Sequence, residues 1–488
     1  MSSKLDPVQV VAIEFAADKP GVAWVMDKGL GKSLTALSEF KFLCDLGEVD
    51  RMIIIAPNSF RIGWLDEIEK HGFEFDAHLF RASKKDRAVE WMNKPRHELA
   101  LPPVMIINYE AARLPAVMTG IVKWASIGKT YVVIDESIQI KGATTKQTRA
   151  VHALCAWGQI TKHPINCRYI RLLTGRPQTQ GPQDLWGQLR AIGLFQGVNF
   201  YTFRNNFCQM GGWENKEVVG AKNVEYLNDL MSPVVFRANK SDWLPLLPRK
   251  DYTIADYKMS GEQKRQYLQM EHHFLLEMQN QTVTVDVAIA KYEKLAQIQT
   301  GFIYSNSGEV IDLVRPEDNP RLLLLQRMLY EEIEGKAIIV YRHRAVFDML
   351  LRALREYDCA WIRGYMTPEE VGEQKKRFNE DPHCRFMLAQ IKAAKFGHTL
   401  IAGQGNDRCG TMIFFENSYS ADDRDQIEDR IHRRGQTGQY VLYIDLSGSD
   451  LDRRIVRALQ KKDALYKTVF KNLRVTVPEP LVSDMKVW

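Results

Sequence analysis

The sequence predicts an α/β protein with two doubly wound parallel-sheet domains and helical insertions between them. Short, continuous apolar runs alternate with amphipathic segments along the chain, which is the pattern of strands that helices cover on both faces. At 488 residues the chain exceeds one ordinary core, so more than one domain is expected. The apolar runs lie at 21–26, 52–56, 104–107, 131–134 and 170–174 in the first half, and at 337–341, 359–362, 386–389, 411–415 and 440–446 in the second half.

The segment between the two halves has a different character. From about residue 184 to residue 300 it is polar, and its apolar residues have helical spacing, most clearly at 262–281 and 286–299. We therefore expect helical insertions that join two sheet domains. The predicted boundaries are 1–235 for an N-terminal domain with a helical protrusion from about 190 to 235, 236–318 for a helical linker and protrusion, and 319–488 for a C-terminal domain.

Composition sets limits on the function. The net charge of +6, from 66 basic and 60 acidic residues, permits an anionic partner, but local clustering must provide the binding surface. Seven dispersed cysteines without a C-x-x-C pair are typical of reduced thiols and argue against a zinc site or a disulfide framework. Neither a signal sequence nor an apolar run of membrane-spanning length is present, so we expect a soluble intracellular protein without a membrane partner.

The segment VAWVMDKGLGKSLTALSEF predicts a phosphate-binding loop between a buried strand and a helix. Gly29 and Gly31 let the backbone approach an anion, Lys32 reaches the β/γ phosphates, and Ser33 holds Mg²⁺ at the positive end of the helix. The strict phosphate-loop pattern has glycine where this chain has Met26. The alternative interpretation is an ordinary strand–turn–helix junction with an exposed lysine.

The segment YVVIDESIQIKG ends an apolar strand in two adjacent carboxylates, Asp135 and Glu136. At the end of a parallel strand this pair would face the crevice in which open α/β sheets bind ligands. In nucleotide hydrolysis one acid holds Mg²⁺ through water and the next orients or deprotonates the attacking water. The alternative is a solvated strand end. The pair follows the glycine-rich loop by about a hundred residues, which favours an ATPase.

The segment QIEDRIHRRGQ predicts a helix with a basic face. Gln426, Arg430 and Arg433 fall at i, i+4 and i+7, so one helix face would carry all three side chains. Arginines on such a face are able to stabilise the charge that develops on a γ-phosphate. The alternative is a basic helix end in solvent.

These segments, in this order, resemble the Snf-type (Swi/Snf-like) DNA translocases of helicase superfamily two. MDKGLGKS resembles D-E-M-G-L-G-K-T, which lacks the glycine of the strict phosphate loop, and DESIQIKG resembles D-E-A-H-R-I-K-N. RLLTGRPQTQGPQDLWGQL is similar to L-L-T-G-T-P-I-Q-N-x-x-x-E-L-W, and QIEDRIHRRGQ is similar to Q-A-x-D-R-x-H-R-I-G-Q. The resemblance covers nearly the whole chain.

The resemblance implies two RecA-like domains that use ATP and Mg²⁺. It also implies that Gln9, in the opening segment LDPVQVVAIEF, reads adenine. The residues it assigns to nucleotide binding are Gln9, Gly29, Leu30, Gly31, Lys32, Ser33 and Gln426; those assigned to catalysis are Lys32, Asp135, Glu136, Arg430 and Arg433; and those assigned to Mg²⁺ are Ser33 and Asp135.

The function implied is that of a DNA-dependent ATPase, which moves on duplex DNA and remodels forks, branched junctions or bound proteins without sequence preference. The alternatives are a strand-separating DNA or RNA helicase and a non-hydrolysing, ATP-gated nucleic-acid binder. By analogy with compact stand-alone members in phages and bacteria, we expect a monomer in the cytoplasm of a bacterial or phage-infected cell. Replication or recombination proteins are the further partners expected.

Three departures separate this chain from the family pattern. Ile138 replaces the histidine that normally links the acid pair to the T-G-x-P segment, and Arg176 replaces the threonine or alanine that is usual in that segment. The segment 388–403 keeps Gly397 and Leu400 but is otherwise the least similar. The resemblance therefore says least about two features: how ATP hydrolysis is coupled to the T-G-x-P segment at Ile138, and which residues of 388–403 contact DNA.

Overall fold

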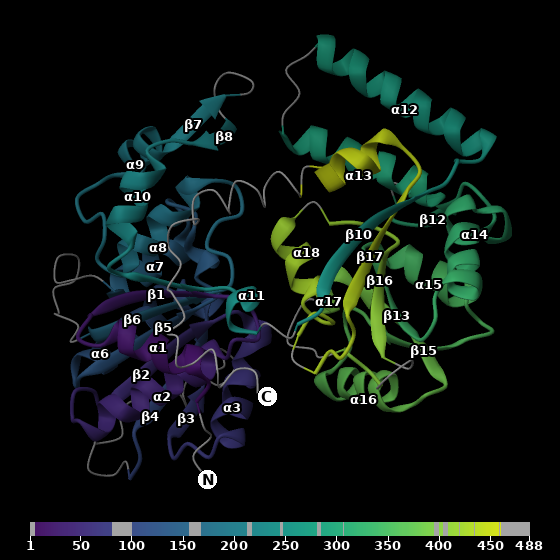
Figure 1. The fold of residues 1–488 in the computed structure, drawn as a ribbon. Helices are drawn as coiled ribbons and strands as arrows, with labels where there is room; N and C mark the ends of the chain where they lie inside the picture. Colours follow the sequence, from purple (N-terminus) through teal and green to yellow (C-terminus); the bar gives the residue numbers. More distant parts are fainter. Residues whose placement is uncertain are drawn as a thin grey trace. The chain divides into compact units, whose positions relative to one another are not determined.

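The computed structural model divides the chain into two compact units, with the boundary between residues 245 and 246 (Figure 1). The side chains at 59, 273–280, 285–292 and 368 are not described. The structure describes residues 5–80, 100–155, 167–211, 217–244, 247–280, 285–305, 307–394, 400–403, 408–418, 420–433, 435–457 and 459.

The first unit is built on a seven-stranded sheet with the order β3-β4-β2-β5-β6-β1-β9. All of its strands pair in parallel, so they all end at the same edge of the sheet. β6 lies between β1 and β5, which brings the ends of these three strands together. The strands are β1 (Gly21–Met26), β2 (Arg51–Ala56), β3 (Asp76–Leu79), β4 (Pro103–Asn108), β5 (Thr130–Asp135), β6 (Cys167–Thr174) and β9 (Val235–Ala238).

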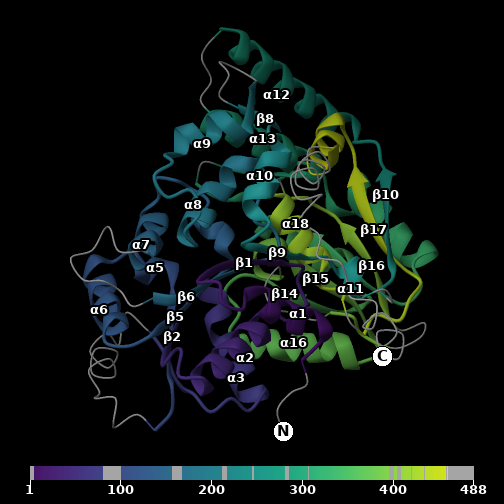
Figure 2. The same ribbon diagram turned by 60° about the vertical axis from the view of Figure 1, so that its left-hand side comes forward.

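Helices cover both faces of this sheet (Figures 1 and 2). Alternate residues of each strand point to opposite faces: on β1, Val22 and Trp24 pack against α1, α2 and α3, whereas Ala23 and Val25 pack against α6, α7 and α8. Continuous apolar strands are thus buried on both sides, as the sequence predicts. The helices are α1 (Pro7–Ala16), α2 (Lys32–Asp45), α3 (Arg61–Lys70), α5 (Tyr109–Ala112), α6 (Pro115–Ser126), α7 (Lys146–Cys155), α8 (Leu185–Ala191), α9 (Phe200–Phe207), α10 (Val224–Met231) and α11 (Lys240–Trp243).

The second unit has a six-stranded parallel sheet with the order β10-β17-β16-β13-β15-β14. One face packs against α14 (Pro320–Arg327) and α15 (Arg344–Ala353). The other face packs against α16 (Pro368–Glu380), α17 (Ile391–Ala394) and α18 (Ala421–Glu428). The strands are β10 (Arg249–Asp256), β13 (Lys336–Tyr341), β14 (Asp358–Ile362), β15 (Cys384–Gln390), β16 (Cys409–Phe414) and β17 (Tyr440–Ser447).

The two doubly wound parallel sheets confirm the predicted fold class. All ten apolar runs are strands, and the two predicted helices of the middle segment are α12 (Gly261–Asn280) and α13 (Val285–Thr300). Within the described part of the chain, no helix is both long and apolar enough to cross a lipid bilayer.

The middle segment is less purely helical than the sequence predicts. β9 pairs with β1 in the first sheet, and β10 pairs with β17 at the edge of the second, so strands from this segment extend both sheets. β10 reads RKDYTIAD and is mostly exposed, so its sequence lacks the apolar run of a central strand. Two short hairpins, β7 (Cys208–Gly211) with β8 (Glu217–Ala221) and β11 (Phe302–Tyr304) with β12 (Val310–Asp312), also lie here.

Candidate active site

The loop that is predicted to bind phosphate follows β1 directly and ends where α2 begins. Gly29 has φ of +88° and Gly31 has φ of +76°, a left-handed conformation that glycine adopts without strain. The side chain of Leu30 between them is fully buried and anchors the turn. Ser33 lies in the first turn of α2 and is partly buried. The backbone therefore turns around the N-terminus of α2, where unpaired N–H groups attract anions.

Gln9 joins α1 to this loop. Its side-chain Oε1 accepts a hydrogen bond from the Asp6 N–H at 2.8 Å, and its Nε2 donates to the Gly31 carbonyl at 3.1 Å. A Cβ at Gly31 would lie 2.0 Å from Gln9 Nε2, so a side chain there would displace the amide of Gln9 from this position. The amide of Gln9 is buried and oriented by these contacts, next to the loop rather than in solvent.

Lys32 folds back over the loop. Its Nζ donates to the carbonyls of Met26 at 2.7 Å and Asp27 at 3.4 Å. Burial lowers the pKa of Lys32, while the charges of Glu136 and Asp135 act in the opposite direction. The ammonium group is therefore held between the loop and the acid pair, where a phosphate would compete for its hydrogens.

Asp135 ends β5 and is held by three hydrogen bonds. Trp64 Nε1 donates to Asp135 Oδ2 at 2.9 Å, and the N–H of Glu136 donates to Oδ1 at 2.9 Å. The hydroxyl of Tyr109 donates to the Asp135 carbonyl at 2.7 Å. Burial and the charge of Glu136 raise the pKa of Asp135 to about 7, although the bond from Trp64 and the charge of Lys32 oppose the rise. A nearby cation would stabilise the ionised form.

Glu136 is partly buried and has φ of +48°, in the left-handed region that a residue with a Cβ rarely adopts. Ser137, which follows, starts a short 3₁₀ turn (Ser137–Ile140) and donates its hydroxyl to Gln188 Oε1 at 2.8 Å. The acid pair is therefore connected to α8 by a side-chain hydrogen bond.

The loop that follows β6 lies between the phosphate loop and the acid pair, because β6 lies between β1 and β5. A Cβ at Gly175 would be 3.4 Å from Lys28 Cγ and 3.7 Å from the Met26 carbonyl oxygen. Arg176 is buried, and its Nε donates to the Gln178 carbonyl at 3.3 Å. Three loops from adjacent strands thus meet at one edge of the sheet.

Ile138, at the family's histidine position, is buried and has no side-chain atom that can form a hydrogen bond. Tyr109, at the start of α5, is only 2% exposed and contacts Asp135 instead of facing solvent. Gly397, in the least similar segment, lies outside the described residues.

In the second unit the predicted helix face does not form. α18 ends at Glu428, so Gln426 is helical whereas Arg430 and Arg433 lie in the turns that follow. Beyond the end of α18 the Glu428 carbonyl accepts from the N–H groups of Ile431 at 3.3 Å and His432 at 3.2 Å, and also from the Tyr443 hydroxyl at 3.1 Å. The expectation of one continuous face at i, i+4 and i+7 was therefore wrong.

Gln426, Arg430 and Arg433 nevertheless lie in the same region of the second unit. Arg430 Nε donates to the Gln426 carbonyl at 2.8 Å, and Gln426 Nε2 donates to Asp422 Oδ2 at 2.7 Å. Burial and the charges of Arg433 and Arg430 lower the pKa of Lys375, on α16. Three cationic side chains thus share one region of the second unit, an environment that favours an anion.

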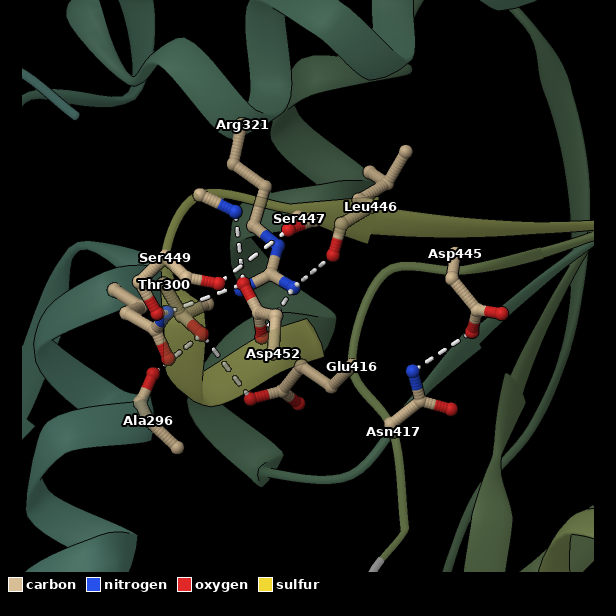
Figure 3. A network of polar contacts seen from close by, with 12 residues as sticks. Ala296, Thr300, Arg321, Glu416, Asn417, Asp445, Leu446, Ser447, Ser449 and Asp452 are labelled. Atoms are coloured by element: carbon tan, nitrogen blue, oxygen red, sulfur yellow. Dashed lines mark hydrogen bonds and ion pairs between the residues drawn. The ribbon is translucent and has the colours of Figure 1, made fainter. Parts of the chain in front are cut away.

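The carboxyl edge of the second sheet carries a buried polar network (Figure 3). Arg321 Nη2 donates to the Leu446 carbonyl at 3.0 Å and lies 3.5 Å from Asp452 Oδ1. Thr300 Oγ1 lies 3.4 Å from Glu416 Oε1, which ties the end of α13 to the residue that follows β16. These contacts fix α13 and α14 against the sheet.

Glu416 also binds the segment after β13. It accepts hydrogen bonds from the N–H groups of Arg342 at 2.8 Å and His343 at 2.9 Å, and its Oε1 lies 2.6 Å from His343 Nδ1. Glu293 of α13 binds both Nη atoms of Arg342, at 2.8 and 2.6 Å. Buried charges therefore hold the helical insertion to the edge of this sheet.

Sequence reasoning missed several contacts of the site. The indole of Trp64 and the hydroxyl of Tyr109 both bind Asp135, and Gln188 binds the residue after Glu136. Neither the spacing nor the residue type of Trp64 and Tyr109 indicated that they are partners of Asp135. Lys240 was also missed: its N–H donates to Asp27 Oδ2 at 2.8 Å beside the phosphate loop.

The donor set of the first unit fits a magnesium-bound nucleoside triphosphate. Gly31 provides a turn that a Cβ would obstruct, and Lys32 provides a cation beside it. Ser33 and Asp135 offer the hard oxygen atoms that Mg²⁺ prefers.

The fold and this site define a two-unit α/β protein of the phosphate-loop class. Residues 18–301 match the model of the SNF2-related domain, and residues 321–435 match that of the helicase conserved C-terminal domain. The chain belongs to the SNF2-related family. This confirms the resemblance stated from its motifs and the predicted enzyme class, the DNA-dependent ATPases.

Curated relatives agree with this assignment. The chain is 23% identical over 474 residues to the human DNA annealing helicase and endonuclease ZRANB3, covering 95% of this chain and 40% of that protein. It is 24% identical over 473 residues to the uncharacterized ATP-dependent helicase MG018 of Mycoplasma genitalium, covering 92% and 41%. The chain therefore spans about 40% of the length of these relatives.

A solved structure is also similar. The Sulfolobus solfataricus SWI2/SNF2 ATPase core in complex with dsDNA aligns with a TM-score of 0.42 and 18% sequence identity, covering 100% of this chain and 96% of that chain.

Proposed function

We propose that this protein hydrolyses ATP to translocate on duplex DNA and to remodel forks, branched junctions or DNA-bound proteins. The observation that carries the proposal is the meeting, at one edge of the first sheet, of the glycine turn at the start of α2 and the adjacent carboxylates Asp135 and Glu136. Family membership supports the DNA dependence. The activity for which one relative is named, that of a DNA annealing helicase, supports remodelling over simple strand separation.

Within the first unit, each residue has a defined task in this proposal. The N–H groups at the start of α2 and the Nζ of Lys32 bind the β/γ phosphates once Lys32 leaves the Met26 carbonyl. Glu136 orients and deprotonates the attacking water. Gln9, already held beside Gly31, presents its amide to adenine.

Magnesium bound by Ser33 and Asp135 would neutralise charge on the phosphates. Trp64 bonds one carboxylate oxygen of Asp135 and the Glu136 N–H bonds the other, so the carboxylate is oriented while its oxygens keep lone pairs for a cation. In the second unit, Arg430 and Arg433 stabilise charge on the transferred phosphoryl group as arginine fingers, with Gln426 beside Arg430 as a further nucleotide-binding residue.

The DNA contact is proposed to be a phosphate contact without base readout, because translocation requires a grip that is the same at every step. Stimulation of ATP turnover by duplex DNA should then be independent of sequence and should fall with salt. The slope in a log–log plot should be about 0.9 per phosphate neutralised. Replication or recombination proteins as further partners, and a monomeric state, belong to the same proposal.

The deciding experiment compares ATP turnover with no nucleic acid, single-stranded DNA, duplex, fork, four-way junction and RNA. We expect duplex and branched DNA to stimulate most. Displacement of a triplex-forming strand from a duplex and migration of a labelled junction then test translocation, beside unwinding of a tailed duplex.

Robust unwinding of long tailed duplexes, with neither triplex displacement nor junction movement, would assign the protein to strand separation instead. If the protein binds ATP but none of these nucleic acids gives turnover, the protein is a nucleotide-gated binder.

A further inference from the structure

A single buried hydrogen bond joins the catalytic acid pair to α8. Ser137, the residue after Glu136, is fully buried and donates its hydroxyl to Gln188 Oε1 at 2.8 Å. The Gln188 amide nitrogen donates to the carbonyls of Pro177 at 2.6 Å and Asp184 at 2.8 Å. Both amide hydrogens and the amide oxygen of Gln188 are therefore bonded, which fixes its orientation.

The loop between β6 and α8 is itself held firmly. Asp184 Oδ2 accepts hydrogen bonds from the N–H of Thr179 at 2.7 Å and the N–H of Gln180 at 2.8 Å. Lys141, after the 3₁₀ turn, donates from Nζ to Thr179 Oγ1 at 2.7 Å. Ser137–Gln188 and Lys141–Thr179 are thus two bridges between the same two segments.

The backbones of these segments also touch. A Cβ at Gly187 would lie 2.2 Å from the Ile140 carbonyl oxygen, so α8 packs on the 3₁₀ turn without an intervening side chain. Little space is left for the two segments to move independently. A displacement of α8 is therefore passed directly to the turn that begins at Ser137.

The backbone conformation of Glu136 has to be maintained by contacts of its neighbours. Its φ of +48° is unfavourable for a residue with a Cβ, and such a conformation persists only where neighbouring contacts impose it. On one side Trp64 holds Asp135, and on the other Gln188 holds Ser137. The backbone that carries Glu136 is thus anchored at both of its neighbours. Ile138, at the family's histidine position, cannot supply this anchor.

We propose that Ser137 and Gln188 are positioning residues that hold the Glu136 carboxylate in its catalytic orientation. The hydroxyl of Ser137 and the amide of Gln188 act through the backbone of Glu136 and do not touch the nucleotide. The inference rests on the proposed role of Glu136 in ATP hydrolysis.

Ser137→Ala tests this inference. It should lower the kcat of DNA-stimulated ATP turnover at least about tenfold, while KM for ATP changes less than about twofold, because transition-state stabilisation is lost without loss of uniform binding. Gln188→Met should have a similar effect, and the double variant should lose no more than either single one. Ser126→Ala, which removes a hydroxyl bonded to the Val122 carbonyl in the same unit, is the matched control and should leave kcat unchanged.

Two further variants separate positioning from loss of structure. Ser137→Thr keeps the hydroxyl and should retain turnover, with ATP binding measured by a fluorescent analogue in every variant. Ser137→Ala added to Glu136→Gln should cause no further loss, since Ser137 acts only through Glu136.

Wild-type kcat in Ser137→Ala, or multiplicative losses with Glu136→Gln, would overturn the inference. Absence of turnover in the wild-type protein with every nucleic acid would instead contradict the proposed function itself.

Discussion

The indole nitrogen of Trp64 donates a hydrogen bond to Asp135 Oδ2 at 2.9 Å, and this contact links α3 to the acid at the end of β5. Trp64 is 2% exposed and Asp135 is 9% exposed, so water replaces the contact poorly if the indole is removed. A hydrogen bond to a charged group contributes about 1.5–3 kcal/mol. The contact therefore fixes the carboxylate that is expected to bind Mg²⁺.

Trp64→Phe should raise the magnesium concentration needed for half-maximal ATP turnover by roughly tenfold, because the carboxylate loses a bond to its ionised form. Trp24→Phe is the matched control: it removes an indole bonded to the Ala12 carbonyl at 3.1 Å, away from the acid pair. Both variants should lose stability, and only the first should change the magnesium dependence. Equal magnesium titrations for the two variants would exclude the assigned role of Trp64.

Gly31→Ala should abolish ATP binding while most of the fold is kept. The added Cβ would meet Gln9 Nε2 at 2.0 Å and would adopt a φ of +76°, so the turn must distort. Gly47→Ala is the control, because Gly47 has φ of +69° with nothing within 4 Å of the added Cβ. Calorimetric titration with ATP, beside thermal unfolding of both variants, checks the expectation. Wild-type ATP affinity in Gly31→Ala would show that the loop tolerates displacement of Gln9.

Much of the first unit could be predicted from the sequence, because apolar strands at regular intervals have few alternatives. The turn between β1 and α2 could be predicted from Gly29 and Gly31, since glycine is the residue that adopts the positive φ found at both positions. The hydrogen-bond partners of Asp135 could not be predicted from the sequence. Trp64 and Tyr109 lie 71 and 26 residues away from Asp135, and only the folded sheet brings them together.

The end of α18 could not be predicted from the sequence. The spacing of Gln426, Arg430 and Arg433 fits a helix, and no glycine or proline interrupts it. The helix ends at Glu428, and tighter turns follow, in which the N–H groups of Arg430 and Ile431 donate to the Ile427 and Glu428 carbonyls. The local pattern of residue types carries no signal of this end. β10 was missed for a related reason, since an exposed edge strand needs no apolar run.

Lys32→Ala should abolish ATP turnover, because the β/γ phosphates lose their point charge. Glu136→Gln should keep ATP affinity while turnover falls by about 10²-fold or more, since the attacking water loses its base. Single-turnover kinetics with radiolabelled ATP measures both quantities. Lys41→Ala, which removes an exposed ion pair with Asp45 on the same helix, is the control and should be silent. Turnover at the wild-type rate in Glu136→Gln would refute the assignment of the base.

Arg430→Ala and Arg433→Ala should each lower turnover by about 10³-fold with little change in the ATP dissociation constant, as loss of an arginine finger does. Lysine at either position should not rescue, because its ammonium lacks the planar fork of the guanidinium. Arg453→Ala is the control, since it removes a surface ion pair with Asp256 in the same unit. Unchanged turnover in both finger variants would show that these arginines serve the fold alone.

The pair His343–Glu416 predicts how the stability of the second unit depends on pH. Burial acts to lower the pKa of His343, but the Glu416 carboxylate and the hydrogen bonds with Glu293 and Glu416 outweigh it and raise the pKa to about 9, despite the nearby charge of Arg342. Because the folded value lies above the ordinary 6.5, the imidazolium contributes fully below pH 6.5, and its contribution is lost as the pH rises through about 9.

Glu416 adds the opposite dependence. Burial would raise its pKa, but the His343 charge and hydrogen bond lower it to about 2, so its contribution is present above pH 4.5 and is lost as the pH falls toward 2. Denaturant midpoints should therefore be highest between pH 4.5 and 6.5.

His343→Gln should flatten the alkaline decline, which is worth on the order of 3 kcal/mol in the wild-type protein. His152→Gln in the first unit, where burial lowers the pKa of the imidazole, should leave that decline in place. Unfolding followed by tryptophan fluorescence at pH 6, 7.5 and 9 checks the prediction. An alkaline decline that persists in His343→Gln with the wild-type slope would mean that another group titrates in this range.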